Sequence, residues 1–186
     1  MRRQSFLITI LALLLLFAAA AHANEPFMLK DINPGGSSSP LSLTNVNGTL
    51  FFAAYDATNG YELWKSDGTE AGTVMVKDIL PGIPSSSPYY LTNVNGTLFF
   101  AAYDDTYGWE LWKSNGTEAG TGLVKDIYPG VGSSDPDKLT DVNGTLFFVA
   151  DDGTNGRELW KSDGTEVGTG LVKDIYPGAS GSSFSY

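Results

Sequence analysis

The strongest constraint on the fold is an internal repeat with a period of 48 residues. Two long strings recur at this interval, Asn-Gly-Thr-Leu-Phe-Phe from Asn47, Asn95 and Asn143, and Glu-Leu-Trp-Lys-Ser from Glu62, Glu110 and Glu158. Lys-Asp-Ile recurs at Lys77, Lys125 and Lys173, and a degenerate copy stands at Lys30. A fixed period of this length is typical of repeat architectures, in which each unit packs on its neighbours.

The repeat also defines the domain organisation. Residues 24–43 are predicted to hold the trailing strand of a partial repeat and a linker, and residues 179–186 the start of a further truncated unit. Between them lie repeat 1 (44–91), repeat 2 (92–139) and repeat 3 (140–178).

Each repeat is predicted to form four short β-strands. In the second repeat these strands cover residues 89–94, 97–103, 109–113 and 122–127. The first two are joined by Asn95-Gly96, a strong hairpin signal because both residues accept a positive φ. Residues 24–186 show no helical periodicity, so the predicted fold class is all-β.

The second strand of each repeat indicates how the sheets pack. In residues 50–55, alternate side chains point to opposite faces of the sheet, and yet both faces are apolar. A four-stranded sheet with two apolar faces has to lie between two neighbours, and 48 residues match one blade of a β-propeller, about 40–50 residues. We predict three 48-residue, four-stranded antiparallel units that form propeller-like blades. Closed propellers have about 4–8 blades, so the ring is either incomplete or completed by oligomerisation.

The repeated strings resemble a known family. Residues 62–69 read Glu-Leu-Trp-Lys-Ser-Asp-Gly-Thr, residues 158–165 repeat this string, and the middle copy departs from it only at Asn115. This pattern is similar to that of the ELWxxDGT repeat family, and the resemblance covers residues 28–178. It implies a secreted, mostly bacterial, hyalin-like and propeller-like repeat protein. The family brings no set of catalytic residues.

The first 23 residues have the features of a signal peptide. Arg2 and Arg3 precede an apolar run at residues 6–21, and Ala21-His22-Ala23 supplies a small-x-small cleavage pattern. The apolar run is shorter than the ~20 residues that a membrane-spanning helix needs. We expect cleavage after Ala23, no membrane insertion of the mature chain, and a secreted, extracellular or cell-surface location, with the periplasm as an alternative.

Composition then excludes several kinds of chemistry. Cleavage removes His22, the only histidine, and the chain has no cysteine. Imidazole bases, Ser-His-Asp triads, thiol nucleophiles and His- or Cys-ligated metals are therefore excluded from the mature chain. Residues 24–186 keep nine of the eleven basic residues against all 21 acidic ones, which argues against nucleic acid as a partner.

Two kinds of repeated acidic residue are candidates for chemistry. The Asp-Gly-Thr-Glu-x-Gly-Thr loops make Asp67 and Asp163 weak candidates for calcium ligands, although a structural turn explains them as well. No other cofactor is predicted. Glu62, Glu110 and Glu158 are candidates for glycosidase-like carboxylates, but an identical residue in every repeat is better explained by a role within the unit, such as pairing with lysine or accepting backbone amides.

Positions that differ between the copies are the better candidates for recognition. Tyr61, Trp109 and Arg157 occupy one equivalent position, and these residue types are favoured at binding hot spots. Aromatic faces also suit sugar rings. The alternative interpretation is random drift at exposed turns.

The sequence thus predicts an exported, non-enzymatic β-repeat module for extracellular or cell-surface interaction or adhesion. The expected partner is an extracellular protein or glycan, and the chain is a candidate homo-oligomer. A carboxylate-dependent secreted polysaccharide hydrolase or lyase, and a structural spacer from a longer array, are the alternatives.

Overall fold

A computed structural model describes residues 26–178 and residue 181, which form twelve β-strands in three sheets and no helix. Each sheet is here called a blade. Blade 1 contains β1 (Leu41–Val46), β2 (Thr49–Asp56), β3 (Gly60–Ser66) and β4 (Val74–Lys77). Blade 2 contains β5 (Tyr89–Val94), β6 (Thr97–Asp104), β7 (Gly108–Ser114) and β8 (Gly122–Lys125). Blade 3 contains β9 (Asp137–Val142), β10 (Thr145–Asp151), β11 (Arg157–Ser162) and β12 (Gly170–Lys173).

Each blade is an antiparallel meander in which every strand pairs with the next one along the chain. The first hairpin of blade 1 turns at Asn47-Gly48, where φ is 51° and 86°. Both values lie in the left-handed region that this two-residue turn requires. The prediction of three four-stranded antiparallel units is therefore confirmed.

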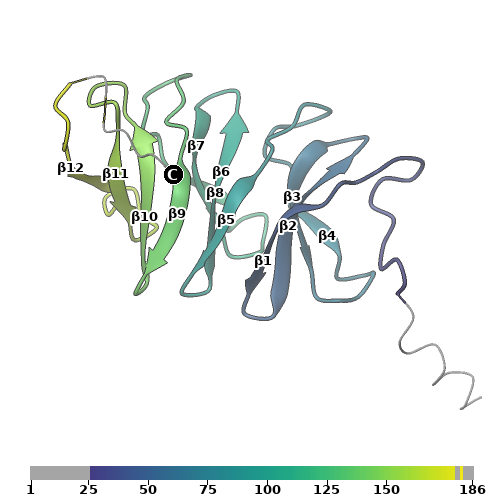
Figure 1. The fold of residues 1–186 in the computed structure, drawn as a ribbon. Coiled ribbons are helices and arrows are strands. Elements are labelled where there is room, and N and C mark those ends of the chain that lie inside the picture. Colours follow the sequence, from purple (N-terminus) through teal and green to yellow (C-terminus); the bar gives the residue numbers. More distant parts are fainter. Residues whose placement is uncertain (1–25, 179–180, 182–186) are drawn as a thin grey trace, which may run out of the picture.

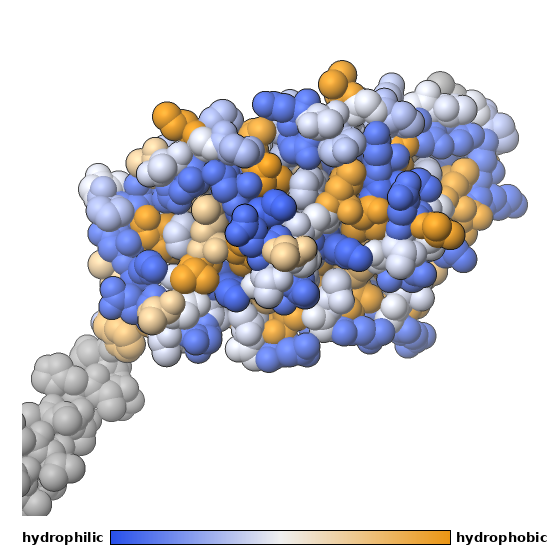
Figure 2. All heavy atoms as spheres, turned by 180° about the vertical axis from the view of Figure 1, so that it is seen from behind, coloured by the Kyte–Doolittle hydropathy of each residue, from blue (hydrophilic) through white to orange (hydrophobic). Residues whose placement is uncertain are grey.

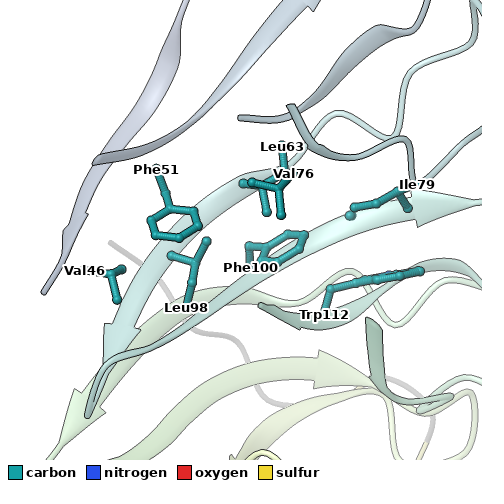
Figure 3. Close-up of a cluster of buried hydrophobic side chains, with 9 residues drawn as sticks. Val46, Phe51, Leu63, Val76, Ile79, Leu98, Phe100 and Trp112 are labelled. Carbon is teal, nitrogen blue, oxygen red and sulfur yellow. The ribbon is translucent and has the colours of Figure 1, made fainter. Parts of the chain in front are cut away.

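The three blades lie side by side in chain order, as Figure 1 shows. At the first junction, side chains from β1 to β4 point toward those of β6 and β7 (Figure 3). This junction buries Val46, Phe51, Leu63, Val76 and Ile79 of blade 1 against Leu98, Phe100 and Trp112 of blade 2. The second junction buries the equivalent residues 48 positions further on, Val94, Phe99, Leu111, Val124 and Ile127 against Leu146, Phe148 and Trp160. The two apolar faces of the second strand thus serve two different cores, as predicted.

The flanks of the row have a mixed surface. In the view from behind, hydrophobic side chains lie in small groups between hydrophilic ones (Figure 2). Within the described residues, no helix exists that is long and apolar enough to cross a bilayer.

The segment before blade 1 differs from the prediction. Residues 26–40 form bends and one turn, and the expected trailing strand is absent from them. No described strand pairs with residues 26–40 in a ladder, and the carbonyl of Ser38 instead accepts the N–H of Tyr55 in β2. The predicted repeat boundaries at residues 44, 92 and 140 fall inside the first strands of the blades, so the sheets follow the same period with a different starting point.

The predicted signal peptide at 1–23 lies outside the described residues. So does the expected further unit at 179–186, apart from residue 181.

Candidate binding cleft

Each repeated glutamate bonds to the segment that follows its own blade. Glu62 lies in β3 and is 0% exposed. Its Oε2 accepts the N–H of Ile79 at 2.9 Å and the hydroxyl of Ser86 at 2.6 Å, and its Oε1 accepts the N–H of Ser86 at 2.9 Å. The carbonyl of Ser86 accepts the N–H of Tyr103 in β6, so this connection is bonded to both blades.

Glu110 does the same for the second connection. It is also 0% exposed and accepts the N–H groups of Ile127 and Tyr128 and the hydroxyl of Ser134. The equivalent Glu158 accepts the N–H groups of Ile175 and Tyr176. These carboxylates accept backbone amides, one of the two roles within the unit that the sequence indicates.

Burial changes the proton affinity of two of these glutamates. It raises the pKa of Glu62 to about 7, although the hydrogen bonds from Ser86 and Ile79 act in the opposite direction. Burial raises the pKa of Glu110 to about 7 against the bonds from Ser134, Tyr128 and Ile127. Since each carboxyl group is enclosed by its own connecting segment, it has no face on which a polymer could bind.

The calcium candidates lie in small exposed turns. Oδ1 of Asp67 accepts the N–H of Thr69 at 2.9 Å and its hydroxyl at 2.7 Å, and these bonds hold the pKa of Asp67 below its usual value. Asp163 makes the same pair of bonds with Thr165, and its pKa is lowered in the same way. Asn115 makes them too, with Thr117 as donor. The carboxyl charge is therefore not needed for the turn.

The surroundings of these turns offer little to a cation. Asp163 lines a hollow of about 440 Å³ together with Lys161, whose ammonium group would repel calcium. Among the residues that the structure describes, no three His, Cys, Asp or Glu side chains lie close enough together to hold a metal ion.

The variable position at the start of the third strand leads to a cleft. Tyr61 of β3 and Trp109 of β7 both line a cleft of about 360 Å³ at the rim of the first junction. The sequence predicts both residues as binding candidates, but nothing in it places them together. We call this site the aromatic cleft; its walls include Leu41, Ser42, Tyr61, Ser87, Tyr89 and Trp109.

Aromatic contacts fix the shape of the aromatic cleft. The ring centroids of Tyr89 and Trp109 are 5.0 Å apart, and the rings meet edge to face at 68°. The ring centroid of Tyr103 lies 5.8 Å from that of Trp109, and the ring centroids of Tyr55 and Tyr61 are 5.3 Å apart. Each of these aromatic rings is therefore held in place by another.

Main-chain bonds fix the backbone of the same residues. The N–H groups of Tyr61 and Trp109 donate to the hydroxyls of Ser85 and Ser133 in the two connections, at 2.9 Å and 3.0 Å. Burial and the nearby charge of Asp135 raise the pKa of Tyr89 to about 12, so its phenol stays neutral at physiological pH.

The third predicted candidate, Arg157, lies at the second junction and not in the aromatic cleft. It forms an ion pair with Asp137 at 2.9 Å and donates to the carbonyl of Asp135 at 3.1 Å. Asp137 and Arg157 are equivalent to Tyr89 and Trp109, so an aromatic pair in blade 2 is replaced by an ion pair in blade 3.

Sequence reasoning missed Tyr89. The signal that identifies Tyr61 and Trp109 is present at this position as well, because its three copies are Leu41, Tyr89 and Asp137. A comparison of every position across the repeats would have found it.

Comparisons with known proteins identify no family. No family model matches the chain, and no curated protein matches it. Among solved structures, it is similar to a crystal structure of the computationally designed Ika8 protein, with 17% sequence identity and a TM-score of 0.43. The similarity covers 80% of this chain and 40% of that one, so the chain spans less than half the length of the designed protein.

Proposed function

We propose that the chain is an exported, non-enzymatic β-repeat module that binds an extracellular glycan through the aromatic cleft, in surface interaction or adhesion. The observation that carries this proposal is that Tyr61 and Trp109, two residues that vary between repeats, line one cleft together with Tyr89. Tyr61 comes from blade 1 and the other two from blade 2, so the cleft depends on the packing of two repeats.

The chemistry of the cleft suits a sugar ring. Trp and Tyr present apolar faces on which the C–H face of a sugar can stack, and their polar edges remain available for hydrogen bonds. Ser42 and Ser87 add hydroxyl groups at the wall of the cleft. A mainly apolar hollow with a few polar groups is typical of small-ligand sites.

The charge of the chain narrows the ligand class. With 21 acidic and 11 basic residues, the formal net charge is −10. A field of this sign repels polyanions such as sulfated or uronate-rich polysaccharides. We therefore propose a neutral glycan.

The glutamates support a binding role over a hydrolytic one. Glu62, Glu110 and Glu158 are each 0% exposed; the first two bond to the connections between blades, and Glu158 bonds to the segment after blade 3. Glycoside hydrolysis needs two carboxyl groups that flank the scissile bond about 5–9 Å apart, and a buried carboxyl group cannot flank a substrate.

The test is isothermal titration calorimetry of the purified protein with a panel of neutral oligosaccharides. The variant carries Tyr89→Asp and Trp109→Arg, which place the residues of blade 3 in blade 2 and keep the fold. We expect it to lose about tenfold or more in affinity, which corresponds to one hot-spot residue. Tyr176→Ala is the matched control, because Tyr176 is 60% exposed and not part of the cleft.

Unchanged affinity of the double variant would exclude the aromatic cleft as the site. Shortened oligosaccharides in the incubation mixture would instead favour the secreted hydrolase or lyase.

A further inference from the structure

Blade 3 has an open face with the composition of a buried junction. Val76 and Ile79 of blade 1 are each 6% exposed, because blade 2 covers them. Their equivalents in blade 3, Val172 and Ile175, are 43% and 57% exposed. Val142 is 46% exposed, whereas Val46 and Val94 are buried. We call this surface the open face; it comprises Val142, Phe147, Leu159, Val172 and Ile175.

The contacts inside the molecule show what fits such a face. At both junctions, the covered face also supplies lysines whose Nζ groups donate to carbonyls of the next blade. Four such bonds of 2.6–3.2 Å exist, Lys65 to Gly116, Lys113 to Gly164, Lys77 to Thr121 and Lys125 to Thr169. The open face carries the equivalent Lys161 and Lys173, and both are exposed. It therefore has the apolar groups and the donors that receive a further blade.

The outer face of blade 1 has the matching apolar groups. Phe52, Ala54 and Trp64 form its core and correspond to Phe100, Ala102 and Trp112 of blade 2. Leu43 is 61% exposed, whereas the equivalent Leu91 and Leu139 pack against the junction cores.

A short segment occupies part of this outer face. Nζ of Lys30 donates to the carbonyl of Thr73 at 2.7 Å, in the way that Lys77 donates to Thr121. Ile32 packs against the core of the outer face, in the way that Ile79 packs at the first junction. Lys30-Asp31-Ile32 thus takes the place of the end of a preceding blade. We call residues 29–33 the strap.

The strap covers the outer face only in part. A cavity of about 220 Å³ lies between the strap and blade 1, lined by Leu29, Ile32, Leu43, Leu50 and Phe52 among others. A complete blade leaves the equivalent Leu98 and Phe100 at 0% exposure. The strap therefore fills the acceptor site less well than a blade does.

We propose that two copies of this chain associate head to tail. The open face of one copy docks on the outer face of blade 1 of another, and Lys173-Asp174-Ile175 replaces Lys30-Asp31-Ile32. Both segments read Lys-Asp-Ile. The docked segment can therefore repeat the lysine and isoleucine contacts that are already present between blades. Such a contact joins two different surfaces, so repeated association leads to a closed ring or an open array.

A second copy suits the open face better than an unrelated protein. The chain itself carries both halves of the contact, an exposed donor face at blade 3 and a partly filled acceptor face at blade 1. The same pair of faces meets twice within the molecule, and the exposed lysines are placed at the repeat interval from those that bond there. Neither of the two docking faces shares a lining residue with the aromatic cleft, so the association does not depend on the proposed function.

The test measures the solution mass by light scattering on a sizing column over a range of protein concentrations. Ile175→Asp breaks the open face, and Leu43→Asp breaks the outer face of blade 1. Val167→Asp is the control, because Val167 is 98% exposed and its equivalent Ala119 stays exposed where blade 3 covers blade 2. Lys30→Ala combined with Ile32→Ser releases the strap.

We expect the unmodified chain and Val167→Asp to associate as the concentration rises, and the strap-released variant to associate at lower concentration. Ile175→Asp and Leu43→Asp alone should each be monomeric. Mixed together they should form a one-to-one dimer and nothing larger, because each retains the face that the other lacks. A misfolded variant would not be rescued by mixing.

Two outcomes would overturn the proposal. One is that both the unmodified chain and the strap-released variant stay monomeric at every concentration. The other is that Ile175→Asp and Leu43→Asp leave the mass of an associating chain unchanged, which would place the contact elsewhere.

Discussion

The two junctions between the blades have the same interior and different rims. Inside, Phe100 at the first junction and Phe148 at the second are both 0% exposed and packed by equivalent neighbours. At the rim, the pair Tyr89 and Trp109 is replaced by Asp137 and Arg157. Positions that stay constant across repeats serve packing, and the rim changes without altering the blade. New binding properties are therefore expected at the rim.

The largest expected effect comes from removing a buried phenylalanine ring from each junction interior. Phe100→Ala and Phe148→Ala should each lower the free energy of unfolding by about 3–5 kcal/mol, since each creates a cavity between two blades. Urea unfolding measures both. Phe52→Ala should cost less, because Phe52 already lines the cavity beneath the strap. Clearly unequal costs for Phe100→Ala and Phe148→Ala would contradict the claim that the two interiors are the same.

The second test concerns pH. Glu62 and Glu110 have a pKa of about 7 in the folded chain, above the value near 4.5 of an ordinary glutamate. The folded state therefore binds more protons than the unfolded state between these values. The stabilisation is fully present below about pH 4.5 and is lost as the pH rises through about 7. Each glutamate contributes at most about 3.5 kcal/mol to this change, at about 1.4 kcal/mol per pH unit of pKa difference.

Thermal unfolding between pH 5 and pH 8 checks this expectation. The melting temperature should fall as the pH rises, and Glu62→Gln and Glu110→Gln should each reduce the slope, because Gln does not titrate. If the two variants reduce this slope equally, the two glutamates lie in electrostatically equivalent surroundings. A melting temperature that rises toward pH 8 would refute the assigned direction.

Local signals in the sequence predict most of the blade. Asn47-Gly48 and its copies predict the first hairpin, and the apolar residues on both faces of the second strand predict stacking. The fourth strand of blade 2 ends at Lys125 and not at residue 127, because the N–H of Ile127 donates to Glu110. The two residues are 17 positions apart, so no local pattern reports this bond.

The aromatic cleft is predictable only in part. Variation between the copies identifies Tyr61 and Trp109 as separate candidates. They share one cleft because blades 1 and 2 meet at the first junction. The distance between Tyr61 and Trp109 depends on how the blades pack, and no local sequence pattern reports it. Arg157 carries the same variation signal, but its ion pair with Asp137 gives the second rim a different chemistry.

The third test compares the contribution to stability of a lysine inside a junction with that of its copy on the open face. Lys65→Met removes a 2.7 Å bond to the carbonyl of Gly116 and should cost about 1.5–3 kcal/mol, as for hydrogen bonds of charged groups. Lys161→Met should change the stability by less than about 0.5 kcal/mol, because Lys161 is exposed. Unfolding is to be measured at a concentration at which the protein is monomeric. Equal losses would mean that the bond to Gly116 does not stabilise the junction.

The smallest expected effect lies in the two rims themselves, and a pair of double-mutant cycles measures it. Truncation of Tyr89 and Trp109 to Ala, singly and together, should give a coupling of about 0.5–1.5 kcal/mol, as for edge-to-face aromatic pairs. The same cycle on Asp137 and Arg157 should give about 0.2–1 kcal/mol, because the side chains of this ion pair are partly exposed. Added salt should weaken the coupling of the ion pair and leave that of the aromatic pair unchanged, since only the former is screened. If salt weakens both couplings equally, the coupling at the first rim is not mainly aromatic. The first rim would then not differ in chemistry from the rim of the second junction.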